Sequence, residues 1–343
     1  MKTKLLSVFG AVIAIAASSA FNAVSAQNTF TNKRELVLSV LDQSKPNEYV
    51  PAAFFLHFDN KLGAKAVQDH AEYIRSINTD LVKIQYEIVV PRLEINDPED
   101  WAKVPVYDAE FFEPQLSVIE DLAKEFKGDI LILPTVYSPL MLLYATAGPD
   151  LQKVISKDPA AAEKAVANLT QSVINYITAA RERGADGFYI STQTYVDNDN
   201  VKAAEKFNKL QRPYDRRVSE VADSIAPFNI LHICGFTGNS VDVESYADYP
   251  GSVINLPTYV GDGHESLQHF YEVFRRPIFG GLNRLGAITG GTIEEAKAEV
   301  DKVLESAPRN FILGANCTVP SDTDYDKLRA IIDYAHSWRK THK

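Results

Sequence analysis

Two cysteines and one histidine carry the strongest chemical signal in this 343-residue chain. Cys234 stands two residues after His232, in Leu231-His-Ile-Cys-Gly235, and Cys317 lies far along the chain in Leu313-Gly-Ala-Asn-Cys-Thr-Val-Pro320. Residues i and i+2 of a strand face the same way, so His232 and Cys234 can share one face. One imidazole and two thiolates form a Zn²⁺ ligand set, and a catalytic zinc keeps its fourth position open.

The same three residues have simpler explanations. The cysteines can be buried as small hydrophobic side chains, or they can form a disulfide in an oxidising compartment. His232 can serve only as a buried hydrogen-bonding group. Zinc and a disulfide would be rival states of one pair, because two thiolates on one ion lie close enough to oxidise when the metal is lost.

Short apolar runs alternate with longer helical patterns along the chain. Strands are predicted over Ala52–Phe58, Asp80–Tyr86, Asp129–Thr135, Gly187–Thr192, Asn229–Cys234, Ser252–Leu256, Pro277–Gly281 and Asn310–Ala315. Helices are predicted over Ala64–Asn78, Gln115–Lys127, Ala160–Arg183, Val201–Ile225, Ser240–Tyr249, Ser266–Phe274, Thr292–Ser306 and Tyr325–Trp338. Eight strands, each followed by a helix, predict a single α/β domain with the (β/α)8 or TIM barrel fold. An open doubly wound sheet and the two-lobed fold of solute-binding proteins are the alternatives.

In a barrel of this kind all strand ends open onto one mouth, where enzymes place their working residues. Cys317 follows the last predicted strand, so a barrel would bring it toward His232 and Cys234. Other polar or aromatic residues at or after predicted strand ends are His57, Glu87, Tyr137, Gln193, Tyr195 and Asn283. We expect these residues to line the mouth, although structural hydrogen bonding explains such positions equally well.

The first 26 residues predict a secretory signal peptide. Lys2 and Lys4 precede an apolar stretch of 13 residues, Leu5–Ala17, and the small residues of Val24-Ser-Ala26 stand before Gln27. The apolar stretch is too short for a transmembrane anchor, because a bilayer core is about 30 Å thick. No cysteine follows the cleavage site, which excludes a lipid anchor there. We therefore expect a mature domain, residues 27–343, in the periplasm or outside the cell.

The charge balance of the chain limits its partners. There are 35 Lys and Arg residues against 45 Asp and Glu, a net charge of −10. Such a chain is expected neither to bind nucleic acid nor to insert into a membrane once the signal is cleaved. A hydrophobic fraction of 45% with 23% charged residues is typical of a globular protein. Two cysteines are too few for a disulfide scaffold.

Several blocks of the chain have the sequence features of one known family. In chain order they are Asn32–Val40, Asp80–Pro91, Pro139–Gly148, His232–Gly235, Phe279–Arg284 with Gly290–Glu295, and Ile312–Pro320. They resemble the first helix, the second strand, the tyrosine-bearing loop and the C-terminal blocks of the uroporphyrinogen decarboxylase superfamily. The resemblance covers nearly the whole mature chain and implies a (β/α)8 barrel, in agreement with the strand count.

One branch of this superfamily decarboxylates uroporphyrinogen without a cofactor. Decarboxylases of this branch need an arginine-rich segment after the first strand, an aspartate before the second-strand proline, a tyrosine and a late histidine. Here the first segment is Phe54–Asn60, without arginine, and the aspartate position falls near Tyr86 and Glu87. Tyr144 matches the tyrosine, whereas the late histidine is absent. Carboxylate substrates need guanidinium groups, so we do not expect this reaction.

A second branch transfers methyl groups between a corrinoid protein and a thiol such as coenzyme M. Its zinc ligands are a His-x-Cys pair and a distant cysteine, which His232, Cys234 and Cys317 match. Zinc lowers the pKa of the acceptor thiol, so that the thiol attacks as a thiolate. Some relatives have an acidic residue at the end of the next strand, where this chain has Asn255. Corrinoid partners of this branch are cytoplasmic, and this chain lacks a cobalamin loop of its own at Asp262–His264.

From these observations we expect an exported, zinc-dependent enzyme that transfers a methyl group to or from a small thiol or related substrate. Zinc would bind His232, Cys234 and Cys317, with no bound organic cofactor. Tyr144 and Glu87 would be catalytic residues on the substrate side, and the expected substrate contacts are His57, Tyr86, Gln193, Tyr195, Asn255 and Asn283. The expected partners are a small-molecule substrate and a corrinoid protein or free corrinoid. The alternatives are a periplasmic binding protein for a tetrapyrrole or corrinoid-like ligand, and uroporphyrinogen decarboxylase activity.

Overall fold

The computed structural model describes residues 32–44, 49–85, 90–126, 128–148, 157–193, 204–236, 241–260 and 263–341, together with Ile155 and Gly238. These residues all belong to one unit, residues 32–343. The predicted signal peptide lies outside the described residues. None of the described helices combines the length and the apolar composition needed to cross a membrane.

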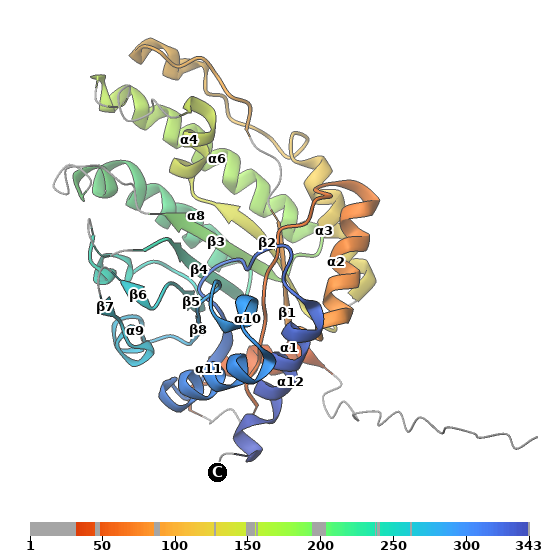
Figure 1. The fold of residues 1–343 in the computed structure, drawn as a ribbon. Coiled ribbons are helices and arrows are strands. Elements are labelled where there is room, and N and C mark those ends of the chain that lie inside the picture. The colour runs from red at the N-terminus through yellow and green to blue at the C-terminus, as the bar shows by residue number, and fades with distance from the viewer. Residues whose placement is uncertain are drawn as a thin grey trace, which may run out of the picture. The chain divides into compact units, whose positions relative to one another are not determined.

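Seven parallel strands form the central sheet (Figure 1). In sheet order they are β1 (Leu81–Ile84), β2 (Leu131–Tyr137), β3 (Gly187–Gln193), β4 (Phe228–Cys234), β5 (Val253–Asn255), β8 (Ile278–Leu282) and β9 (Phe311–Ala315). Strand order follows chain order, as expected when each strand–helix unit packs beside the one before it. The α/β class and seven of the eight predicted strands are confirmed. A two-stranded antiparallel hairpin, β6 (Tyr259–Val260) with β7 (Gly263–His264), was not predicted.

Helices follow the strands in the expected alternation. They are α1 (Lys33–Leu38), α2 (Gly63–Ile77), α3 (Glu113–Phe126), α4 (Pro139–Ala147), α6 (Pro159–Glu182), α8 (Arg212–Ile225), α9 (Leu267–Phe274), α10 (Ala287–Gly290), α11 (Ile293–Ser306) and α12 (Tyr325–Thr341). Shorter turns are the 3₁₀ helices η1 (Ser39–Leu41), η2 (Pro98–Lys103) and η4 (Val243–Tyr246), and the π-helix η3 (Phe207–Gln211). Helix α11 begins at a capping box, in which the Thr292 hydroxyl accepts from the Glu295 amide while the Glu295 carboxylate accepts from the Thr292 amide.

The predicted helix over Ser240–Tyr249 is wrong, since η4 is the only helical turn among the described residues of this range. The buried hydrophobic side chains there are Val241, Val243, Tyr246 and Tyr249. The last three recur every three residues, which is the period of a 3₁₀ turn and not of an α-helix. Pro250 follows directly and leaves no room for a longer helix before β5.

Side chains alternate between the two faces of the sheet and build separate cores. On β2, Leu131 and Leu133 point inward and join Tyr189 and Ile230 in one buried cluster. The outward residues pack against the covering helices in the two larger clusters. On β4, Phe228 and Ile230 belong to the inner face, so the strand period places His232 and Cys234 on that same face.

The first predicted strand, Ala52–Phe58, is extended but forms only a single parallel bridge with the described residues, between Ala52 and Leu313. Leu313 of β9 donates its amide to Pro51 and accepts from Ala53, at 2.8 and 3.0 Å. On the other side, the Asp80 amide donates to the Ala52 carbonyl at 3.1 Å. Pro51 has no amide hydrogen to donate, which interrupts a regular ladder here. The described sheet therefore has seven strands, with this segment lying between β9 and the start of β1.

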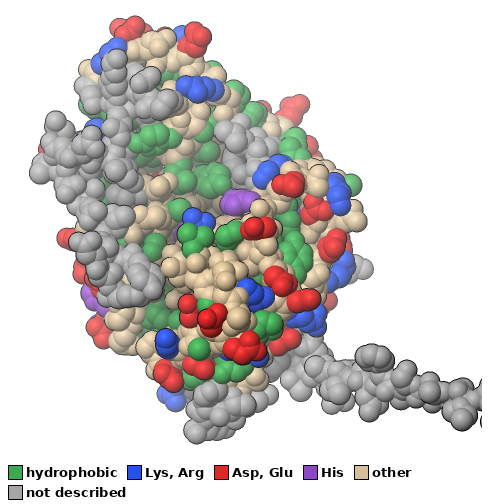
Figure 2. Space-filling model, in the orientation of Figure 1, with side chains coloured by type: hydrophobic (Ala, Val, Ile, Leu, Met, Phe, Trp, Pro, Cys, Tyr) green, Lys and Arg blue, Asp and Glu red, His purple; other side chains and the backbone are tan. Residues whose placement is uncertain are grey.

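One face of the molecule carries acidic and basic side chains next to one another among the described residues, with hydrophobic side chains gathered above a histidine near its centre (Figure 2). Many charged side chains of the described residues form ion pairs, as in Arg183 with Glu113 and Glu120 at 2.8 and 2.7 Å. Exposed pairs of this kind each contribute about 0–1 kcal/mol. The stability of the fold therefore depends mainly on the buried clusters.

Asp215 is a buried carboxylate between α8 and the outer face of the sheet. Its Oδ2 accepts from the Thr192 hydroxyl at 2.5 Å and from the Gln211 amide at 3.1 Å. Its Oδ1 has no hydrogen-bond partner among the described residues. Burial raises the pKa of Asp215 to about 7, against the opposing effect of these hydrogen bonds.

We predict that Asp215→Asn removes a pH dependence of stability. A carboxyl group whose folded-state pKa is raised contributes stability that is full below its unfolded pKa, about 4, and is lost as pH rises through about 7. The variant should therefore gain about 1–3 kcal/mol on the wild type between pH 5 and pH 8. Urea unfolding at both pH values measures this difference. The exposed Asp121→Asn on α3 is the control, and an equal pH dependence in all three proteins would contradict the prediction.

Candidate metal centre

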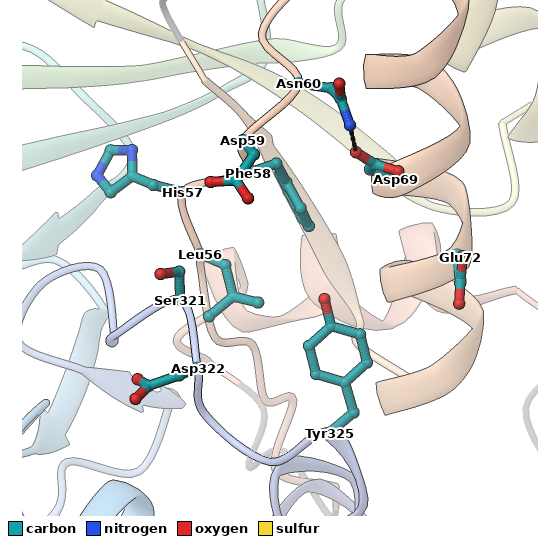
Figure 3. A pocket seen from close by; sticks show the side chains of 10 residues that line it. All are labelled: Leu56, His57, Phe58, Asp59, Asn60, Asp69, Glu72, Ser321, Asp322 and Tyr325. Carbon is teal, nitrogen blue, oxygen red and sulfur yellow. Dashed lines mark hydrogen bonds between the residues drawn. The ribbon is translucent and has the colours of Figure 1, made fainter.

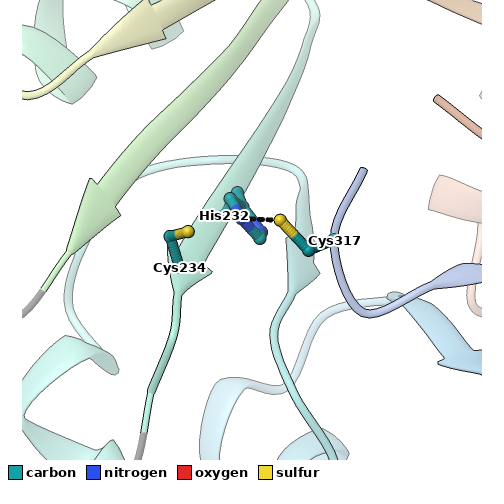
Figure 4. A group of neighbouring side chains, drawn as sticks. All are labelled: His232, Cys234 and Cys317. Atoms are coloured by element: carbon teal, nitrogen blue, oxygen red, sulfur yellow. Dashed lines mark hydrogen bonds between the residues drawn. The ribbon is translucent and has the colours of Figure 1, made fainter. Parts of the chain in front are cut away.

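His232, Cys234 and Cys317 come together at the carboxyl ends of the parallel strands (Figure 4). His232 and Cys234 are the last two residues of β4 on its inner face. Cys317 follows the end of β9 by two residues. One ligand atom from each lies within 4.8 Å of the others. Residues separated by more than 80 positions are thus joined because parallel strand ends share one edge of the sheet.

His232 is almost fully buried, with 2% of its surface exposed. Its Nε2 lies 3.7 Å from the Cys317 sulfur. Its ring stacks on Tyr189 of β3, with the ring centroids 5.0 Å apart and the planes 28° apart. The other ring nitrogen, Nδ1, has no hydrogen-bond partner among the described residues. The imidazole therefore presents Nε2 to the thiols.

Both cysteines are free and partly accessible. A hydrogen bond between the two sulfur atoms lowers the pKa of Cys317 and raises the pKa of Cys234, and burial adds to the rise at Cys234. A soft divalent cation would take the place of the thiol protons and give both thiolates a partner. The residues present therefore fit a zinc ion in their donor chemistry and their spacing.

A buried lysine and a half-buried arginine add positive charge near the sulfurs. Lys83 on β1 is 8% exposed, and its Nζ lies 3.4 Å from the Thr318 hydroxyl and 5.2 Å from the Tyr189 ring centroid. Arg284 donates to the Thr318 carbonyl at 3.2 Å. Both charges oppose the rise in the pKa of Cys234. They favour thiolates at this site.

Sequence reasoning missed Lys83 and Tyr189. A charged residue inside the apolar run Leu81–Ile84 was the available signal for Lys83, since lysine is rarely found in a buried strand. For Tyr189 the signal was the strand period, because it shares the inner face of β3 with Gln193. Neither signal indicates that the tyrosine ring contacts His232.

The predicted substrate contacts at the central strands have different surroundings. Gln193 is exposed at the end of β3 and is the ladder partner of Cys234, so it lies at the mouth beside the sulfurs. Asn255 is fully buried at the end of β5. Its Oδ1 accepts from the Tyr189 hydroxyl at 2.8 Å, and its Nδ2 donates to the carbonyls of Phe279 and Ala315 at 2.8 and 3.2 Å. The side-chain amide of Asn255 therefore forms hydrogen bonds with residues of three other strands of the sheet, β3, β8 and β9.

The other predicted residues differ in their surroundings. Exposed His57 has its Nδ1 3.2 Å from the Gln85 side-chain oxygen. Asn283 accepts from the Leu285 amide at 2.9 Å in the turn after β8. Tyr144 on α4 and Tyr137 at the end of β2 are half-buried against the outer core. Tyr86, Glu87 and Tyr195 lie outside the described residues.

The described residues also enclose a separate cavity of about 330 Å³ (Figure 3). It is bounded by the loop that follows the extended segment, by α2 and by the start of α12. His57 and Tyr325 line it, together with the carboxylates Asp59, Asp69, Glu72 and Asp322. The Asn60 amide donates to Asp69 at 2.7 Å, as drawn in Figure 3. None of the three metal-ligand candidates lines this cavity.

The fold resembles that of solved methyltransferase structures. A methyltransferase from Methanosarcina mazei superposes with a TM-score of 0.74 at 16% identity, covering 90% of this chain and 99% of that one. A B12-independent methionine synthase from Shewanella sp. W3-18-1 superposes with a TM-score of 0.57 at 13% identity, covering 85% and 98% of the two chains. At such identities the likeness shows the fold.

Sequence comparison finds similarity to the same class of protein. The methylcobamide:CoM methyltransferase MtbA of Methanosarcina mazei is 25% identical over 170 residues, which cover 48% of this chain and 46% of that protein. The chain thus spans about half the length of the curated relative that it matches. The family model described as uroporphyrinogen decarboxylase (URO-D) matches residues 81–338. Since this match extends over well more than half of the sequence and agrees with the predicted resemblance, the chain belongs to the uroporphyrinogen decarboxylase family.

Proposed function

We propose that this protein is a zinc-dependent methyltransferase that moves a methyl group between a corrinoid carrier and a small thiol. The observation that carries the proposal is the meeting of one imidazole and two sulfurs within 4.8 Å at the strand ends. The name of the sequence relative, a methylcobamide:CoM methyltransferase, supports the reaction class. For the fold, we infer that the extended segment 51–55 completes a (β/α)8 barrel around this site.

The protein's own residues would prepare a thiol for reaction. Bound zinc would lower the pKa of an acceptor thiol so that it reacts as a thiolate. His232, Cys234 and Cys317 would hold the ion, and the positive charge of Lys83 would offset part of the negative charge of two thiolates. The inner core below the site is apolar, which excludes water from that side.

The substrate would enter from the mouth. Gln193, exposed beside Cys234, offers an amide to a bound substrate, and exposed His57 offers a second polar contact. We keep Tyr144 and Glu87 as the proposed substrate-side residues, because Tyr144 lies on α4, which follows β2, and Glu87 follows β1 in the sequence. Asn255 contributes indirectly, since its amide is occupied within the sheet.

We predict about one zinc ion per chain in protein purified with reduced thiols and without chelator. His232→Ala, Cys234→Ser and Cys317→Ser should each weaken zinc binding by more than about 100-fold, because loss of a ligand costs more than loss of a supporting group. Metal analysis and chelator competition measure this. The matched control is His269→Ala on the outer helix α9, which should bind as the wild type. A reduced wild-type protein without zinc affinity would refute the proposal.

We predict methylation of a thiol by the zinc-loaded protein. With methylcobalamin as donor and 2-mercaptoethanesulfonate as acceptor, the visible spectrum of methylcobalamin should be lost at a rate that Cys317→Ser lowers by at least about 100-fold. His269→Ala should retain the wild-type rate. Zinc binding with tight corrinoid binding but no turnover would contradict methyl transfer and favour a binding protein. Release of carbon dioxide from uroporphyrinogen would instead indicate a decarboxylase.

We also infer that residues 1–26 direct export and that residues 27–343 form the mature domain. The support is the basic start, the apolar stretch and the small residues before Gln27. Protein recovered from the producing cell should begin at Gln27 and lie outside the cytoplasm. Mass spectrometry of the intact protein in each cell fraction measures this, and a cytoplasmic chain that retains Met1 or begins at Lys2 would contradict it.

A further inference from the structure

The orientation of His232 is set in an unusual way for a metal-binding histidine. Such histidines normally donate their second ring nitrogen to a carboxylate, a carbonyl or water, which fixes the ring plane. In His232 that atom is Nδ1, which has no hydrogen-bond partner among the described residues. The contact that orients the ring is instead its stacking on Tyr189, at 5.0 Å and 28°.

Tyr189 is itself held at its far end. Its hydroxyl donates to Asn255 Oδ1 at 2.8 Å, and both side chains are buried, with 3% and 0% exposed. The Nδ2 group of Asn255 uses its two hydrogens on the carbonyls of Phe279 and Ala315. All hydrogen-bonding groups of the amide except one acceptor lone pair are therefore engaged, which fixes the Tyr189 ring.

The same amide also reaches the strand that leads to Cys317. Ala315 is the last residue of β9, two positions before that cysteine. Gly280 of β8 has φ of +141°, and a Cβ there would lie 3.3 Å from Asn255 Nδ2. A glycine therefore gives the amide the room it needs between β8 and β9.

We propose that Tyr189 and Asn255 are positioning residues that hold His232 and Cys317 at metal-binding separation. Stacking fixes the imidazole, and the Asn255 hydrogen bonds join that stack to the strand end before Cys317. The pair links β3, β4, β5, β8 and β9 across the inner face of the sheet. This inference rests on the proposed zinc function and assigns no contact between the pair and the metal.

The test uses cobalt(II), whose visible absorption reports the geometry and the thiolate ligands of the site. Tyr189→Leu removes the stack and should weaken cobalt and zinc binding by about 10–100-fold, the range for lost supporting groups. Tyr189→Phe keeps the ring but frees it from Asn255, and should weaken binding several-fold and shift the cobalt bands. Affinity comes from titration against a competing chelator, on the full chain with reduced thiols.

The matched control is Tyr73→Phe, because Tyr73 is equally buried and also loses one hydroxyl hydrogen bond, to the Phe54 carbonyl at 3.0 Å. This variant should lose stability in a thermal melt without changing the cobalt spectrum. If Tyr189→Leu does not fold, Tyr189→Phe decides the question. A folded Tyr189→Phe protein with wild-type affinity and spectrum would overturn the positioning role while leaving zinc binding intact. A wild-type protein that binds neither metal would instead refute the proposed function.

Discussion

A buried carboxylate just before β1, that of Asp80, helps to link the two edge strands of the sheet, β1 and β9. Asp80 accepts from the Ala52 amide at 2.8 Å, from the Tyr49 hydroxyl at 2.9 Å and from His336 of α12 at 2.8 Å. It thereby ties the extended segment to β1, while β9 holds the other side of that segment. Losing one partner of a buried charged network costs about 3–5 kcal/mol. Hydrogen bonds therefore run from β9 through this segment to the start of β1.

The strand period and the parallel arrangement of the strands then decide which side chains lie at the carboxyl ends of the strands. The strand period places His232 and Cys234 above the buried Phe228 and Ile230 on one face. The parallel arrangement brings the end of β9, and with it Cys317, to the same edge of the sheet. Neither the histidine nor the cysteines could form a site on local structure alone. The site is therefore a product of the topology.

Much of this was predictable from the sequence, and the failures have physical causes. Apolar runs such as Ile130–Leu133 predict buried parallel strands, and the His-x-Cys spacing predicts a shared face. The stacking of Tyr189 on His232 depends on strand register, which a single sequence does not reveal. The substrate contact of Asn255 stays a prediction, whereas its hydrogen bonds to residues 24 to 66 positions away were not predicted. Contacts between residues so far apart in the chain produce no recognisable pattern in the sequence around Asn255.

The carboxylate-lined cavity has a consequence for how molecules approach the sulfurs. Asp59, Glu72 and Asp322 make the opening of this cavity electronegative, and their potential extends about 8–10 Å into solvent at physiological salt. By contrast, Lys83 and Arg284 add positive charge near the sulfur atoms. An anion diffusing toward the protein would be repelled at the cavity and attracted near the sulfurs. The arrival of a charged molecule would thus be directional, and its rate would depend on ionic strength.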